Sequence, residues 1–265
     1  FDREGMGPSW LFLMVLGCVC VEISVPHQSM TPLDESDEGS GLISMHTSVE
    51  MHHNNSHVSK DVTVFYHVYL PYPHRDPTQR ILQEQVEMIE KSPIYHHIKA
   101  VKYTTIHIPV DLHPFCKKCH LVDHYPKGYE MKTLQHVYEH CVAHPTERVV
   151  YIHTKGTFHN SLGNKVFRRA LMRSVLSEEC YKARGKFGCN TCGFRYSPLP
   201  HPHFPGDMFA ADCEYVSKLI PPNRASRRIS VASHHVFGIS KAPQKVPHRS
   251  GYGVGRYAAE FWIAT

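Results

Sequence analysis

A short polar run after an apolar segment holds the side chains best suited to bind a ligand. The run is His153-Thr154-Lys155-Gly156, and it directly follows the strand-like stretch 149–152. In open α/β sheets, ligands bind in the crevice at the carboxyl ends of the strands. His, Thr and Lys can donate hydrogen bonds to phosphate or sugar oxygens, and Gly lets the backbone approach closely. The pattern fits a ligand-binding loop and an ordinary solvated loop equally well.

A second candidate turn lies at Gly206-Asp207, before a segment with helical spacing over 207–219. Gly206 permits a tight turn, and Asp207 is placed to cap the following helix. Asp207 is equally well placed to point into a crevice and bind a sugar hydroxyl or a metal. The sequence leaves both roles open.

Strand and helix patterns alternate around these two turns, which predicts an α/β fold with a right-handed βαβ crossover. Two intervening segments, 110–130 and 185–206, are rich in Cys, His and Pro, and we expect loops there. The expected strands are 62–69, 100–108 and 149–152, and the expected helices are 78–91, 130–144, 165–180 and 207–219.

Two C-x-x-C pairs raise the question of a metal site. They are Cys116 with Cys119, and Cys189 with Cys192. The two pairs together could form a tetrahedral zinc site, and Cys116 to His120 has the spacing of a c-type haem attachment. The gap between the pairs is far longer than in a zinc ribbon, and disulfides are the better explanation in a secreted protein.

The segment His136-x-x-Glu139-His140 fits the inverted zinc-protease motif. On a helix the two histidines share a face, Glu139 could act as the base, and Glu214 as a distant third ligand. A zinc-dependent hydrolase is therefore an alternative function. An amphipathic helix with exposed His and Glu is the simpler interpretation, so we predict no metal site here.

The N-terminal part differs in composition from the rest of the chain. Met6 is the expected start, and the apolar run 10–21 has the length of a signal-peptide core or a short signal anchor. We therefore expect a leader over 1–25, a disordered polar stem over 26–60 and one globular domain over 61–265. The whole chain has 42% hydrophobic residues and a net charge of +5, which is enough apolar content for a core and is compatible with anionic partners.

A leader would place the protein in an oxidising compartment. Seven cysteines follow it, and an odd number leaves one free thiol or one intermolecular bond. Asn54 begins a glycosylation acceptor sequence. We expect a disulfide-bonded glycoprotein of the ER or Golgi lumen, either secreted or a type II membrane protein.

Four segments in a fixed order carry a family resemblance. They are 153–157, Asn164 with Arg168-Arg169, 204–209 and 256–263. The first resembles a strand ending in H-[TS]-K-[GS], the third an F-x-G-[NT]-M-[FW] turn, and the last an R-Y-x-x-E-[FW]-W segment. Together they resemble a set of eukaryotic secretory proteins that are in turn similar, at the distance of the rhamnan-synthesis class, to nucleotide-sugar glycosyltransferases of the GT-A type.

This resemblance implies a single-domain, GT-A-like (Rossmann-like) fold with a doubly wound mixed sheet. It implies transfer of a sugar from a nucleotide-sugar donor to a glycan or protein acceptor, with no nucleic acid among the partners. The chain ends just after the apolar run 261–263, which suggests a truncated domain. The remaining alternative is a disulfide-rich, non-catalytic carbohydrate-binding or interaction protein.

The resemblance also implies roles for individual residues. Asp207 would lie in the sugar pocket and Glu260 would be the general base. Asp207 stands where the related pattern prefers Asn, and no D-x-D pair is present, so Mn²⁺ or Mg²⁺ remains a candidate cofactor without assigned ligands. The implied substrate-binding residues are His153, Thr154, Lys155, Gly156, Asn164, Arg168, Gly206 and Arg256.

Overall fold

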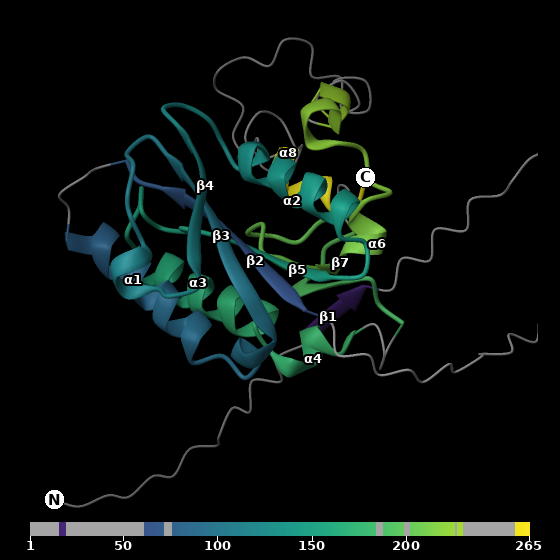
Figure 1. Cartoon of the computed structure of the whole chain (residues 1–265), viewed down its shortest axis with the longest axis horizontal. Helices are drawn as coiled ribbons and strands as arrows, with labels where there is room; N and C mark the ends of the chain where they lie inside the picture. The colour runs from purple at the N-terminus through teal and green to yellow at the C-terminus, as the bar shows by residue number, and fades with distance from the viewer. Residues whose placement is uncertain are drawn as a thin grey trace, which may run out of the picture.

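A seven-stranded mixed sheet forms the centre of the molecule (Figure 1). The computed structural model describes residues 16–19, 61–71, 76–183, 188–198, 202–225, 227–229 and 258–265. The strand order is β1-β6-β7-β5-β2-β3-β4. The strands are β1 (Leu16–Val19), β2 (Val62–Tyr69), β3 (Ile98–Ile106), β4 (Cys119–Tyr125), β5 (Arg148–His153), β6 (Thr191–Phe194) and β7 (Phe209–Asp212).

Half of the sheet is parallel and half is antiparallel. Strands β4, β3, β2 and β5 run parallel to one another, whereas β7, β6 and β1 join them through antiparallel pairs. The central strand β2 is apolar along most of its length because helices cover both of its faces. Val64 and Tyr66 face one core, and Phe65 faces the other.

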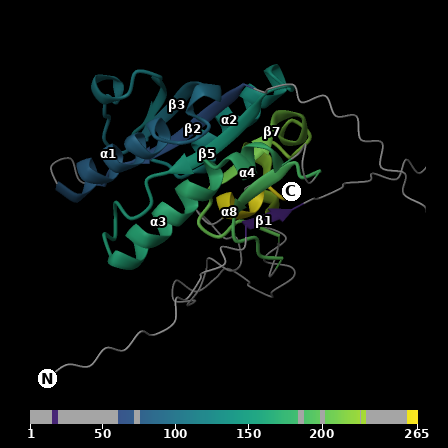
Figure 2. The same cartoon turned by 90° about the horizontal axis from the view of Figure 1, so that it is seen from below.

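Helices cover both faces of the sheet (Figures 1 and 2). Helices α1 and α3 pack on one face, and α2, α6 and α8 pack on the other. This arrangement confirms the expected GT-A-like (Rossmann-like) class, a doubly wound mixed α/β sheet. The helices are α1 (Asp76–Glu90), α2 (Met131–Ala143), α3 (Leu162–Val175), α4 (Glu178–Tyr181), α6 (Cys213–Val216) and α8 (Ala258–Trp262), and two 3₁₀ turns lie at η1 (Tyr95–His97) and η2 (His113–Phe115).

Three sequence predictions of local structure were wrong. The expected loop 110–130 contains β4, a polar edge strand that pairs on one side with β3. The expected loop 185–206 contains the short strand β6. The expected helix 207–219 is instead strand β7 followed by the single turn α6. Its apolar start is buried between β5 and β6, and strand pairing overrides the helical spacing there.

Disulfides exclude the metal roles considered for the cysteines. Cys116 pairs with Cys119, so these two cannot attach haem or bind zinc as thiolates. Cys192 pairs with Cys180, and Cys189 is disulfide-bonded as well. A third bond joins α2 to α6. All seven cysteines beyond the expected leader are therefore oxidised. Of the two alternatives that their odd number left open, a free thiol or an intermolecular bond, the free thiol is not found among them.

Only a small part of the expected leader and stem is described. Within 1–60, strand β1 pairs antiparallel with β6, and the other positions lie outside the described residues. Among the described helices, none has the length and apolar character needed to cross a membrane.

Candidate functional site

A pocket of about 530 Å³ lies at the carboxyl edge of the parallel strands. Strands β2 and β5 end here, and β7 begins here because it runs antiparallel to β5. Helices α2 and α3 also start at this edge, as expected for helices that follow parallel strands. The lining residues are His67, Tyr69, Gly128, Tyr129, Glu130, His153, Thr154, Lys155, Gly156, Thr157, Phe158, His159, Asn164, Asp207, Ala259 and Glu260.

This pocket brings together most of the residues that the sequence singled out. The loop 153–156, Asn164, Asp207 and Glu260 all line it, although they come from distant parts of the chain. Gly206 lies beside it and contacts His153. Arg168 does not line the pocket, and Arg256 lies outside the described residues.

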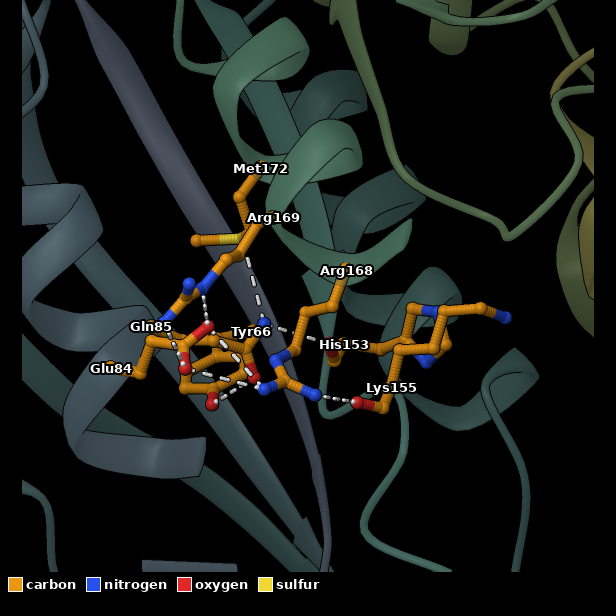
Figure 3. Close-up of polar contacts among 8 residues, drawn as sticks. All are labelled: Tyr66, Glu84, Gln85, His153, Lys155, Arg168, Arg169 and Met172. Carbon is orange, nitrogen blue, oxygen red and sulfur yellow. Dashed lines mark hydrogen bonds and ion pairs between the residues drawn. The ribbon is translucent and has the colours of Figure 1, made fainter. Parts of the chain in front are cut away.

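The loop after β5 is fixed by hydrogen bonds to three successive backbone carbonyls, and Figure 3 shows the two of these bonds that come from α1 and α3. Gln85 Nε2 of α1 donates to the carbonyl of His153 at 2.9 Å. Thr157 Oγ1 donates to the carbonyl of Thr154 at 3.1 Å. Arg168 Nη1 of α3 donates to the carbonyl of Lys155 at 2.8 Å. The loop is thereby held to both neighbouring helices, which preorganises it for a ligand.

Thr154 joins this loop to β2. Its hydroxyl accepts a hydrogen bond from the backbone N–H of Tyr69 at 2.9 Å and donates one to the carbonyl of the same residue at 3.1 Å. A hydroxyl has a single hydrogen to donate. Thr154 therefore positions the loop, and the expected donation from its hydroxyl to a ligand is not available.

Arg168 is buried and holds the loop through its bond to the Lys155 carbonyl, whereas the sequence predicted that it contacts substrate. Its side chain is 2% exposed and forms an ion pair with Glu84 at 3.3 Å. Arg169 shares the same carboxylate at 3.0 Å. Gly156 has a φ of +94°, and a Cβ there would lie 3.1 Å from Arg168 Nη1. Glycine at this position lets the loop close over the guanidinium.

His153 links the loop to the turn before β7. Its Nε2 lies 2.8 Å from the carbonyl of Gly206. A carbonyl only accepts, so Nε2 carries the hydrogen, and Nδ1 of the neutral ring keeps its lone pair. Burial, and next the nearby Lys155 ammonium, lower the pKa of His153 to about 4. The ring is therefore neutral at pH 7 and acts as a fixed polar contact, with no positive charge for a phosphate.

Asp207 is the most unusual group in the pocket. It has a φ of +50°, is 4% exposed, and neither carboxyl oxygen has a hydrogen-bond partner among the residues that the structure describes. Burial raises the pKa of this carboxyl well above its usual range, and Glu130 and Glu260 raise it further. Asp207 caps no helix, because β7 follows it. A buried carboxyl without partners is suited to exchange hydrogen bonds with a ligand.

Sequence reasoning missed three residues of this region. His67 lies opposite His153 in the β2–β5 pair, lines the pocket and bonds Thr133 Oγ1 at 2.8 Å. Glu130 lines the pocket at the start of α2, at the boundary between the expected loop 110–130 and the expected helix 130–144. Gln85 is fully buried on α1. Two of these residues could have been found in the sequence, because each is a polar side chain inside an apolar pattern. His67 interrupts the apolar strand 62–69, and Gln85 lies among the apolar positions of the helix 78–91.

The H-x-x-E-H segment does not form a metal site. Both ring nitrogens of His140 are engaged, Nδ1 with Lys102 Nζ at 3.2 Å and Nε2 with Glu147 at 3.0 Å. His136 Nε2 instead contacts Tyr125 Oη at 3.0 Å. Across the described ranges, no group of three or more His, Cys, Asp or Glu side chains could hold a metal ion. The structure therefore gives no support to the hydrolase alternative.

Comparison with known proteins identifies a family but no activity. No curated protein matches the chain. One similar solved structure is a "putative nucleotide-diphospho-sugar transferase" from Desulfovibrio desulfuricans G20, which is 9% identical over 76% of this chain and 94% of that one. Its TM-score is 0.29, so the likeness carries no argument about function. A family model described as a domain of unknown function, DUF8361, matches residues 65–265, and the chain belongs to this family.

Proposed function

We propose that this protein is a glycosyltransferase of the secretory pathway that transfers a sugar from a nucleotide-sugar to a hydroxyl of a glycan or protein acceptor. One observation carries the proposal. Lys155, Asp207 and Glu260 come from three separate segments and line one pocket at the carboxyl edge of a doubly wound sheet. Such folds bind nucleotide ligands at this edge.

The donor diphosphate would lie against Lys155. Its ammonium supplies a positive charge in the pocket, and the N-termini of α2 and α3 point their partial positive charge toward the same edge. Asn164, in the first turn of α3, adds an amide that can donate to phosphate or sugar oxygens. These groups favour the diphosphate end of the donor on the loop side of the pocket.

The sugar would lie over Asp207, which follows the Gly206 carbonyl that His153 contacts. Asp207 retains its proton to a higher pH than an ordinary Asp, so its carboxyl can both donate to and accept from sugar hydroxyls. This contact would satisfy the two carboxyl oxygens, which have no hydrogen-bond partner within the described part of the chain. Asp207 would thus fix the sugar for attack.

Glu260 would act as the general base. Its carboxylate takes the proton of the acceptor hydroxyl as the hydroxyl oxygen bonds to the anomeric carbon. The bond between that carbon and the diphosphate oxygen breaks, and the electron pair leaves with the diphosphate. Lys155 offsets the negative charge that develops on this leaving group. The described residues contain no cluster of three or more His, Cys, Asp or Glu side chains that could hold a metal ion, and the steps above are assigned to side chains alone.

Calorimetric titration with UDP-, GDP- and CMP-linked sugars, with and without Mn²⁺, tests donor binding. Replacing Lys155 with Ala removes a charge-assisted contact worth about 1.5–3 kcal/mol, so affinity should fall roughly tenfold or more. The control is Lys91→Ala, because Lys91 directly follows α1 with 77% of its side chain exposed. The Lys91 variant should bind donor as the unchanged protein does.

Transfer is tested separately from binding. The Glu260→Gln variant should keep donor affinity and lose transfer to acceptor, because Gln cannot accept the proton. If the unchanged protein binds none of the three donor classes under either metal condition, the proposal is wrong. Binding of free glycans in that case would favour the non-catalytic carbohydrate-binding alternative.

A further inference from the structure

Three large apolar side chains are exposed on α3 and on the loop that precedes it. Phe158, Leu162 and Val166 have 54%, 76% and 60% of their surface exposed. Leu162 and Val166 are one turn apart on α3 and therefore share a side of the helix. Phe158 lies just before α3 and itself lines the pocket. We call these three residues the apolar tip. Exposed apolar side chains that gather on one part of a surface mark interaction sites.

Basic side chains lie on the same helix as the apolar tip. Lys165 and Arg173 are exposed on α3, whereas Leu171, Met172 and Val175 face the core. Arg169 is also on the outer side but pairs with Glu84. The sequence of α3 contains no acidic residue. Figure 2 shows α3 along the lower edge of the fold, away from the sheet centre. The outer side of α3 is therefore apolar near the pocket and positively charged further along.

We propose that the apolar tip, with Lys165 and Arg173, docks onto a membrane surface that contains anionic lipid. Leu162 and Val166 would enter the boundary between headgroups and acyl chains, together with Phe158. Lys165 and Arg173 would meet the anionic headgroups, and their long side chains can extend to reach them. The positive charge of α3 is complementary to such a surface and would add to the burial of the apolar tip.

Docking in this way would bring the pocket to the membrane. Phe158 belongs both to the apolar tip and to the pocket lining, and Asn164 of the same helix also lines the pocket. A ligand anchored in the membrane would then reach the pocket without leaving the bilayer surface. This inference goes beyond the proposed transferase activity and does not depend on it, because membrane docking is measured without donor or acceptor.

Vesicle flotation of the full chain provides the first test. Phosphatidylcholine vesicles that also contain phosphatidylserine should bind more protein than vesicles of phosphatidylcholine alone, and added salt should weaken the difference. The double variant Leu162→Ser and Val166→Ser should bind about tenfold less. The control is Val142→Ser, since Val142 is 54% exposed on α2. Equal loss in the control, or no binding to anionic vesicles, would overturn the proposal.

Tryptophan quenching locates the docked surface independently of other membrane-binding parts of the chain. In the Phe158→Trp variant, spin-labelled phosphatidylcholine should quench the added fluorescence on binding, and in Val142→Trp it should not. Quenching of both, or of neither, would contradict docking through the apolar tip. A further control measures binding of the unchanged protein and of the double variant to beads that carry an acidic polypeptide. If the double variant loses binding to these beads but binds vesicles as the unchanged protein does, the apolar tip docks onto a protein and the membrane assignment is wrong.

Discussion

The side chain of Gln85 connects helix α1 to the backbone of His153, 68 positions further along the chain. Its Nε2 donates to the His153 carbonyl at 2.9 Å, and its Oε1 accepts from Tyr66 Oη at 2.9 Å. Gln85 is fully buried, so neither bond exchanges with water. The position of the candidate binding loop is therefore set by a residue on a helix that forms no part of the pocket.

Replacing Gln85 with Leu should destabilise the protein and loosen the loop. The change leaves the His153 carbonyl and the Tyr66 hydroxyl buried without this partner, at about 1–3 kcal/mol for each group. Urea unfolding measures the loss of stability, and hydrogen exchange of the 153–157 amides measures the loosening. The control is Gln83→Leu on the same helix, where Gln83 is exposed and bonds Glu87. Equal losses in both variants would contradict this role for Gln85.

Substituting Ala for Gly206 should be far more harmful than the same change at Gly163. Gly206 has a φ of +91°, and a Cβ there would lie 2.8 Å from Leu171 Cδ1, so we expect a cost of about 1–3 kcal/mol. Gly163 lies in α3, and a Cβ there would meet only Ser161 Oγ at 3.9 Å. Gly163→Ala should therefore stabilise by up to about 1 kcal/mol. Thermal unfolding of the two variants measures both changes in stability, and a loss at Gly163 as large as that at Gly206 would contradict this prediction.

The Asp207→Asn variant should be more stable than the unchanged protein at neutral pH. The pKa of Asp207 is higher in the folded state than its ordinary value of 3.8, so ionisation favours the unfolded chain as pH rises above about 4. The advantage of the variant should grow by up to about 1.4 kcal/mol per pH unit until the folded-state pKa is reached. Well below pH 3.8 the carboxyl is protonated in both the folded and the unfolded state, and this pH-dependent advantage should vanish.

Urea unfolding as a function of pH measures this difference, with Glu90→Gln as the control on an exposed site of α1. The backbone at φ +50° is no obstacle to Asn, which adopts the left-handed region readily. A variant that is less stable than the unchanged protein at pH 7 would show that the carboxylate is ionised and stabilised in the folded state, which contradicts the direction of its pKa shift.

Two disulfides should contribute unequally to stability. Cys141 and Cys213 are 72 positions apart and join α2 to α6, whereas Cys116 and Cys119 are 3 apart. Loop-closure entropy predicts a loss of about 4 kcal/mol on replacing the first pair with Ser and about 2 kcal/mol on replacing the second. Unfolding of the two double variants measures both values. A larger loss for the Cys116 pair would show that local packing outweighs chain entropy.

Much of the parallel half of the fold could be predicted from the sequence. The strands at 62–69 and 149–152 are long apolar runs, and α1 and α2 have clear apolar faces, so local pattern and tertiary packing agree there. The antiparallel half could not be predicted. Strands β6 and β7 are short, and β7 follows Asp207 with a spacing that also fits a helix. Only its pairing with β5 and β6 resolves that ambiguity.

The sequence alone determined that a polar loop with His153 and Lys155 follows a buried strand, because a strand that stops at such a run must present it at the sheet edge. Only the tertiary structure decided what these side chains can do. Antiparallel β7 and helix α8 bring Asp207 and Glu260 to the same pocket, over a distance that no local pattern encodes. Side chains of α1 and α3 bond the loop carbonyls, and the Lys155 side chain of the loop lines the pocket. Burial, which depends on the whole fold, makes His153 neutral and raises the pKa of Asp207.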